Sequence, residues 1–167
     1  MNIAVLGGKF DPPHFGHLLV INQILEKVDY IDKVLLIPVN THPWKTIVAS
    51  PADRLAMIKL LKSDRIEVAD IDIKRGGQTF TIDTIKELTA NKANKYYWVS
   101  GSDILSEFDK WKDHQESKSK HPPDNMQWRI FSHQWFYNNK INRIRNSIDN
   151  NQQISKNIIR GSGRMFF

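Results

Sequence analysis

The fold is decided at the start of the chain, where residues 1–17 read MNIAVLGGKFDPPHFGH. The apolar run Asn2–Leu6 stops at two glycines, which is typical of a buried parallel strand that ends in a turn. Apolar residues then recur at helical spacing through residues 15–28 and form one stripe: Leu18, Ile21, Leu25 and Val28. The opening segment therefore predicts a strand, a glycine-rich loop and a helix.

The rest of the chain repeats this alternation. Four further runs read as strands: Val34–Val39, Ile66–Ile73, Tyr96–Ser100 and Met126–Ser132. Strand–helix–strand units cross over with a right hand in nearly all proteins. The pattern predicts an α/β fold, a Rossmann-like three-layer α/β/α arrangement with a mainly parallel five-stranded sheet. Such sheets bind ligands at the carboxyl ends of their strands, where the loops are 7–15, 40–49, 74–81 and 100–103.

Two of the intervening helices have recognisable starts. Ser50 can cap a helix in which proline takes the first position, and Asp53 completes a capping-box-like pattern. The apolar face of that helix would be Leu55, Ile58 and Leu61. A glycine-containing turn precedes the next helix, which Thr81 or Thr79 would cap and which would run to about Asn91.

Composition sets the broad class of protein. A chain of 167 residues predicts one domain, 1–167, and the absence of cysteine rules out disulfides and thiolate metal sites. The N-terminus has no signal-peptide pattern and no run is long enough for a membrane span, so we expect a cytoplasmic protein. The net charge of +6 divides into −1 for residues 1–109 and +7 for residues 110–167. The positive charge is thus confined to one segment, and such a tail is usually a solvated surface. We therefore do not expect nucleic acid as a partner.

The first loop carries the sharpest chemical signal. Free amides at a helix N-terminus, together with the helix dipole, make the glycine-rich turn an anion site. Its glycines fit neither a Walker loop nor the G-x-G-x-x-G dinucleotide fingerprint. His14 and His17 would share one face of the first helical turn, close to that site. Without a third ligand at recognisable spacing a zinc site is disfavoured; the two imidazoles would bind phosphate oxygens or, alternatively, serve as capping or core residues.

This loop resembles the G-G-x-F-D-P-x-H-x-G-H motif of nucleotidyltransferases that adenylylate small molecules. Further stretches look like bacterial nicotinate-nucleotide adenylyltransferase: His42–Lys45, Ser50–Met57, Arg75–Ile85, Gly101–Asp103 and Lys110-Trp111. The resemblance covers about residues 1–113, and the block Arg75–Ile85 is the most specific part. It implies a nucleotidyltransferase domain that is clear over 1–113 and divergent or truncated over 114–167. The implied reaction is adenylyl transfer from ATP to nicotinate mononucleotide, in NAD biosynthesis.

The resemblance also implies roles for the matching residues. For ATP it implies the side chains of His14, His17, Lys45 and Asp103 and the backbone of Gly8, Lys9 and Phe10, with the two histidines and the lysine as catalytic groups. For the pyridine nucleotide it implies Thr81 and Thr84 beside the pocket and Trp111 as a stacking partner. Three of these residues have simpler readings, since Thr81 could be a helix cap, Lys45 a solvated charge and Trp111 a packing aromatic.

The reaction suits these residues. The acceptor phosphate is already an anion, so no general base is needed, and positioning with charge neutralisation would supply most of the catalysis. The expected cofactor is Mg²⁺, bound through the ATP phosphates, and no metal site made by protein side chains is expected. The partners would be ATP and nicotinate mononucleotide, and the sequence leaves homo-oligomerisation open.

The C-terminal part departs from the family. Its second phosphate motif, Ile-Ser-Ser-Thr-x-Ile-Arg, corresponds here to residues 154–160, in which Ser155 and Arg160 match and Lys156 and Asn157 do not. We expect Ser155 and Arg160 to bind ATP. Three other functions stay open: phosphopantetheine adenylyltransferase, a cytidylyltransferase, and a degenerate nucleotide-binding protein with little turnover.

Overall fold

The computed structural model describes residues 1–101 and 125–131. The chain divides into two compact units, Met1–Ile130 and Phe131–Phe167, and the first contains the sheet and its helices. Its strands are β1 (Asn2–Gly8), β2 (Lys33–Pro38), β3 (Ile66–Val68), β4 (Lys95–Gly101) and β5 (Met126–Phe131). Its helices are α1 (Phe15–Lys27), α2 (Pro51–Lys59), α3 (Ile71–Arg75) and α4 (Thr81–Thr89).

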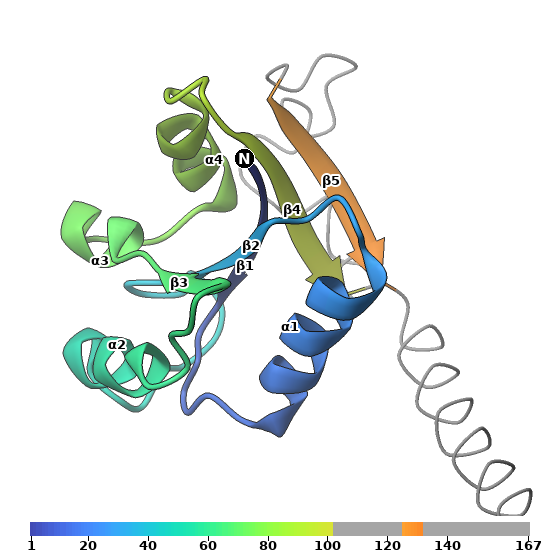
Figure 1. The fold of residues 1–167 in the computed structure, drawn as a ribbon. Helices are drawn as coiled ribbons and strands as arrows, with labels where there is room; N and C mark the ends of the chain where they lie inside the picture. The colour runs from blue at the N-terminus through green and yellow to red at the C-terminus, as the bar shows by residue number, and fades with distance from the viewer. Residues whose placement is uncertain (102–124, 132–167) are drawn as a thin grey trace, which may run out of the picture. The chain divides into compact units, whose positions relative to one another are not determined.

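The strands form one five-stranded sheet in the order β3-β2-β1-β4-β5. β1 pairs in parallel with both β2 and β4, and β2 pairs in parallel with β3. The arrows of β4 and β5 point the same way (Figure 1). Because the chain starts in the centre of the sheet and moves outward in both directions, the strand order reverses beside β1, between β1 and β4. Ligands of open α/β sheets bind at such a point.

Helices cover both faces of the sheet. Figure 1 shows α1 and α2 on one side and α3 and α4 on the other. Alternate strand residues, such as Val5 and Ile37, pack with Ile85 and Leu88 of α4 in one apolar core. On the side of α1, Ile21 is completely buried. The predicted Rossmann-like three-layer fold with a mainly parallel five-stranded sheet is confirmed.

The third strand is shorter than the sequence predicts. The expected strand Ile66–Ile73 ends at Val68, and residues 71–75 form α3 instead. The alternation of Ile71 and Ile73 suits a strand, but helical geometry buries Asp72, whose carboxylate bonds to α4 and to Arg75 one turn along. This tertiary contact outweighs the local pattern.

The cap of α4 also differs from the prediction. Phe80 is the N-cap residue and makes no side-chain capping bond, and Thr81 is the first residue of the helix. The Thr79 hydroxyl instead accepts the backbone N–H of Asn40 at 2.9 Å, a contact between two loops that the sequence does not reveal. The start of α2 is as predicted, since the Ser50 hydroxyl accepts the N–H of Asp53. Among the described residues no helix is long and apolar enough to cross a membrane.

Candidate functional site

A pocket of about 530 Å³ lies at the carboxyl edge of the sheet. It is lined from the first loop by Gly7, Gly8, Lys9, His14 and His17 and from the second by Val39, His42 and Lys45. Asp72 of α3 and Thr81 and Thr84 of α4 also line it, together with Thr79 just before α4. The residues of β4 that line it are Trp98 to Gly101. The structure therefore brings together most of the predicted site residues that it describes.

The histidine pair starts α1 and is held by backbone contacts. Nδ1 of His14 accepts the N–H of Gly16 at 3.2 Å, and Nδ1 of His17 accepts the N–H of His14 at 3.1 Å. The two rings lie 3.9 Å apart between centroids. Since each Nδ1 is an acceptor, the neutral tautomer of each ring carries its proton on Nε2. Both side chains can thus donate an N–H to an anion in the pocket.

His17 is neutral at physiological pH. Burial, and secondarily the nearby His14, lowers the pKa of His17 to about 4. A neutral imidazole attracts phosphate through a directed hydrogen bond and not through a net charge. The ring also lies 4.8 Å from that of Phe10, between centroids. Phe10 is 1% exposed and its side chain packs beneath the loop, so only its backbone remains for the predicted ligand contact.

Two glycines of the first loop are required by neighbouring rings. A Cβ at Gly16 would lie 2.9 Å from the His14 ring, and a Cβ at Gly7 would lie 2.9 Å from the Trp98 ring. Gly16 lets the His14 ring fold back onto the helix start. Gly7 lets Trp98 lie against β1 at the pocket wall.

The second loop, residues 40–49, positions a cation at the pocket. Nδ1 of His42 accepts the backbone N–H groups of Trp44 and Lys45, both at 3.1 Å, which forms a tight turn. This turn holds Lys45 among the residues that line the pocket. Nζ of Lys9 reaches the carbonyl of Thr46 at 3.5 Å. Lysine side chains from two loops therefore lie near the histidine pair.

Arg54 is a structural element of the site that the sequence analysis missed. It is 0% exposed, and it lies on the same face of α2 as the buried Ile58, four residues later. Its guanidinium donates to backbone carbonyls of both loops, and burial lowers its pKa. Arginine nevertheless stays protonated in proteins. The sequence did contain a signal for its burial. Arg54 precedes the apolar Ile58 by four residues, so it lies on the helix face that was predicted to be buried.

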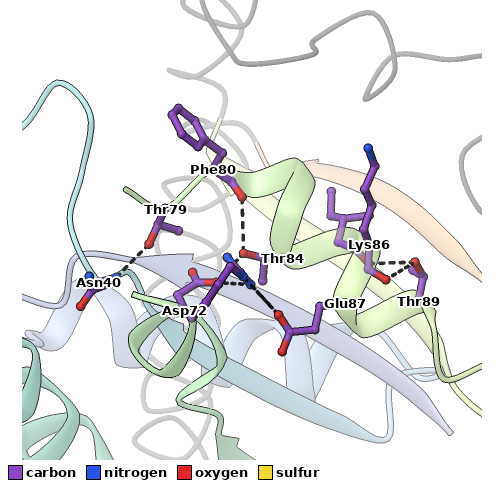
Figure 2. Close-up of polar contacts among 10 residues, drawn as sticks. Asn40, Asp72, Thr79, Phe80, Thr84, Lys86, Glu87 and Thr89 are labelled. Atoms are coloured by element: carbon purple, nitrogen blue, oxygen red, sulfur yellow. Dashed lines mark hydrogen bonds and ion pairs between the residues drawn. The ribbon is translucent and has the colours of Figure 1, made fainter. Parts of the chain in front are cut away.

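The other end of the pocket is formed by α3 and α4 (Figure 2). The Thr84 hydroxyl donates to Oδ1 of Asp72 at 2.5 Å, and both residues are almost completely buried. Arg75 pairs with Asp72 at 3.0 Å and with Glu87 at 2.9 Å. Burial raises the pKa of Asp72, while Thr84 and Arg75 oppose the shift. Thr84 borders the pocket as predicted, but its hydroxyl proton is donated to Asp72.

Four predicted site residues lie outside the described part of the chain: Asp103, Trp111, Ser155 and Arg160. Their roles stay predictions. Within residues 1–101 and 125–131 no group of three or more acidic or histidine side chains could hold a metal ion.

The geometry, a glycine-rich loop and a histidine pair at the reversal point of a parallel sheet, defines an α/β protein with a pocket that is a candidate anion site. The cytidylyltransferase-like family model matches residues 5–153. A probable nicotinate-nucleotide adenylyltransferase of Nitratiruptor sp. is 38% identical over 120 residues, which cover 70% of this chain and 67% of that protein. Another from Synechococcus sp. is 40% identical over 114 residues, 65% of this chain and 56% of that protein.

The solved structures agree on the fold. A nicotinic acid mononucleotide adenylyltransferase of Plasmodium falciparum, complexed with NaAD, superposes with a TM-score of 0.62 at 16% identity, over 78% of this chain and 75% of that chain. The chain belongs to the cytidylyltransferase-like family and, within it, groups with the nicotinate-nucleotide adenylyltransferases. It spans between about half and two thirds of the length of the curated relatives that it matches.

Proposed function

We propose that this protein transfers the adenylyl group of ATP to nicotinate mononucleotide, which yields nicotinate adenine dinucleotide and pyrophosphate. The acceptor phosphate oxygen forms a bond to the α-phosphorus of ATP as the bond to the pyrophosphate oxygen breaks. The observation that carries the proposal is one pocket that combines the histidine pair and Lys45 with the start of α4. The relatives are named for this activity, and a structural neighbour is complexed with NaAD.

The phosphate end of the pocket suits this reaction. Nε2–H groups of His14 and His17 and the ammonium of Lys45 would contact the triphosphate and stabilise the charge that grows on the departing pyrophosphate. Donors held in place before the reaction need no reorganisation during it. The backbone N–H groups that donate to both Nδ1 atoms hold the two imidazole rings in place before the reaction.

Mg²⁺ would enter with the nucleotide. The ATP phosphates would be its main ligands in this proposal. Bound there, Mg²⁺ would neutralise phosphate charge. Residues Thr81 and Thr84 would border the acceptor, and Asp103, Trp111, Ser155 and Arg160 would complete the site as the family resemblance implies. A cytoplasmic location stays our expectation.

The test is pyrophosphate release from ATP and Mg²⁺ with each acceptor in turn. We expect release with nicotinate mononucleotide and none with phosphopantetheine. Robust turnover with phosphopantetheine, or with CTP and its acceptors, would overturn the assignment. ATP binding without pyrophosphate release would support the alternative of a nucleotide-binding protein without turnover.

A further inference from the structure

Arg54 holds four peptide carbonyls in place from a completely buried position. Its guanidinium donates to the carbonyl oxygens of Lys9 at 2.9 Å, Val39 at 2.7 Å, Asn40 at 2.7 Å and Ala49 at 3.2 Å. No ion pair found within residues 1–101 and 125–131 includes Arg54. A buried charge satisfied by carbonyl dipoles fixes those peptide groups, because an unpaired N–H there is costly.

These carbonyls connect the two loops that form the phosphate end of the pocket. Val39 directly precedes the second loop, Asn40 begins it, Ala49 ends it, and Lys9 belongs to the first loop. One side chain thus closes the second loop at both ends and attaches it to the first. Asp11 reinforces this closure from the first loop, since its carboxylate accepts the N–H groups of Val48 at 2.6 Å and Ala49 at 3.0 Å.

We propose that Arg54 is a positioning residue, which holds Lys45 in register with the histidine pair so that both loops engage one triphosphate. Arg54 does not itself line the pocket, so it acts through the loops. The inference rests on the proposed function for its substrate, while the geometry of the two loops stands independently of it.

The geometry of the guanidinium matters more than its charge. Its five N–H donors form a rigid planar fork, whereas a lysine ammonium is a compact charge with three donors. An ammonium at this position cannot span carbonyls that come from both loops and from both ends of residues 40–49. Arg54→Lys therefore keeps the positive charge but loses hydrogen bonds that hold the two loops together.

Arg65, which is exposed where Arg54 is buried, provides a control that makes a comparable set of hydrogen bonds. It also donates to three backbone carbonyls, of Leu25 at 3.3 Å, Ile31 at 2.7 Å and Asp32 at 3.0 Å. These contacts lie next to the start of β2, at the amino end of the sheet and away from the pocket. Arg65→Lys thus breaks a similar set of bonds without touching either loop.

The experiment combines Arg54→Lys with Lys45→Ala in the full chain. In the parent, Lys45→Ala should raise the KM and the Kd for ATP. Arg54→Lys should lower kcat/KM by about 10²-fold, as expected for misplaced groups. Adding Lys45→Ala to Arg54→Lys should then change the Kd and kcat/KM by less than about threefold, because the lysine is already displaced. Arg65→Lys should leave kcat/KM and the Lys45→Ala effect close to those of the parent.

Hydrogen exchange supplies a readout without substrate. Arg54→Lys should speed amide exchange in residues 41–49, and Arg65→Lys should not, even if both lower Tm by the same amount. If the parent releases no pyrophosphate, the proposed function fails, and the ATP Kd cycle and hydrogen exchange still decide the role of Arg54. Equal effects of Lys45→Ala in the parent and the Arg54→Lys background, or unchanged exchange in the loop, would overturn the inference.

Discussion

At the scale of single residues, the site depends on which nitrogen of each histidine carries a proton. Backbone N–H groups occupy Nδ1 of both His14 and His17, which leaves the Nε2–H of each neutral ring as its remaining donor. The spacing of the two residues predicted a shared face and an anion site. Capping was the alternative interpretation, and the structure shows that both rings make capping bonds at the start of α1. Their contact with phosphate stays a prediction.

We expect His17→Ala to lower kcat far more than it raises the Kd for ATP. Its Nε2–H should contribute most as charge develops on the phosphates, and losing one preorganised donor typically costs about 10²–10³ in rate. His14→Ala should behave similarly. Steady-state kinetics and ATP titration measure the two effects. A folded variant with near-parental turnover would show that the histidines are structural.

Stability should depend on pH through His17. Its pKa is about 4 in the folded protein against 6.5 as an ordinary value, so the unfolded chain binds more protons between these two pH values. The free energy of unfolding should therefore fall as pH drops from about 6.5 to about 4 and be unaffected by this group above that window. Denaturant titrations of the parent and of His17→Asn measure it. An equally steep decline in both proteins would exclude His17 as the source.

At the scale of elements, α3 and α4 act as one unit at the end of the pocket that the proposed function assigns to the acceptor. Thr84, Asp72 and Arg75 join the two helices through one buried network. Arg75 extends it to Glu87 at the surface of α4. The first turn of α4 is thereby placed at the pocket although its N-cap residue, Phe80, makes no side-chain cap.

Thr84→Val should loosen this unit. It removes one of the two partners of Asp72 Oδ1, while Arg75 remains as the other. A hydrogen bond to a charged group typically contributes about 1.5–3 kcal/mol. We expect a lower free energy of unfolding and a higher KM for the acceptor, with the Kd for ATP unchanged. Thr84→Ser keeps the hydroxyl and should retain most of both properties. Indistinguishable stability of the two variants would show that the hydrogen bond contributes nothing.

At the scale of the whole molecule, the site is assembled from loops that are far apart in the chain. Lys9, Asn40 and Gln78 belong to three loops that meet at one edge of the sheet. Thr41 pairs with Gln78 in an isolated parallel bridge, and Asn40 donates its side-chain N–H to the Gly77 carbonyl. The family resemblance predicts a further phosphate motif at residues 154–160, which lie outside the described residues and whose role stays a prediction.

The altered tail motif predicts weak activity that can be raised. Lys156→Ser with Asn157→Thr should restore hydroxyls that bond to phosphate, at about 1.5–3 kcal/mol each at most, so a gain of about tenfold or more is expected. Arg160→Ala should weaken ATP binding with and without that double change, because no neutral side chain replaces a guanidinium at phosphate. Turnover of the four proteins measures this. Unchanged rates throughout would mean that residues 154–160 are not a phosphate motif.

Local sequence determined the order of the strands and of helices α1, α2 and α4, and the content of the first loop. The apolar run before Gly7, the helical spacing after Phe15 and the Ser50 cap each depend on neighbouring residues, and each is found in the structure. Strands that are joined through a helix pair in parallel. The right hand of this crossover then decides which face of the sheet the helix covers. The carboxyl edge could therefore be named as the site in advance.

The tertiary structure alone decided the contacts between segments distant in sequence. Asp72 turns a predicted strand end into a helix because its buried carboxylate is satisfied by Thr84, twelve residues away. Arg54 is buried because carbonyls of two loops surround it, and three of these carbonyls, of Lys9, Val39 and Asn40, are far from it in the sequence. Periodicity reports which face of an element is apolar, whereas buried polar groups are placed by partners that only the folded chain brings within hydrogen-bonding distance.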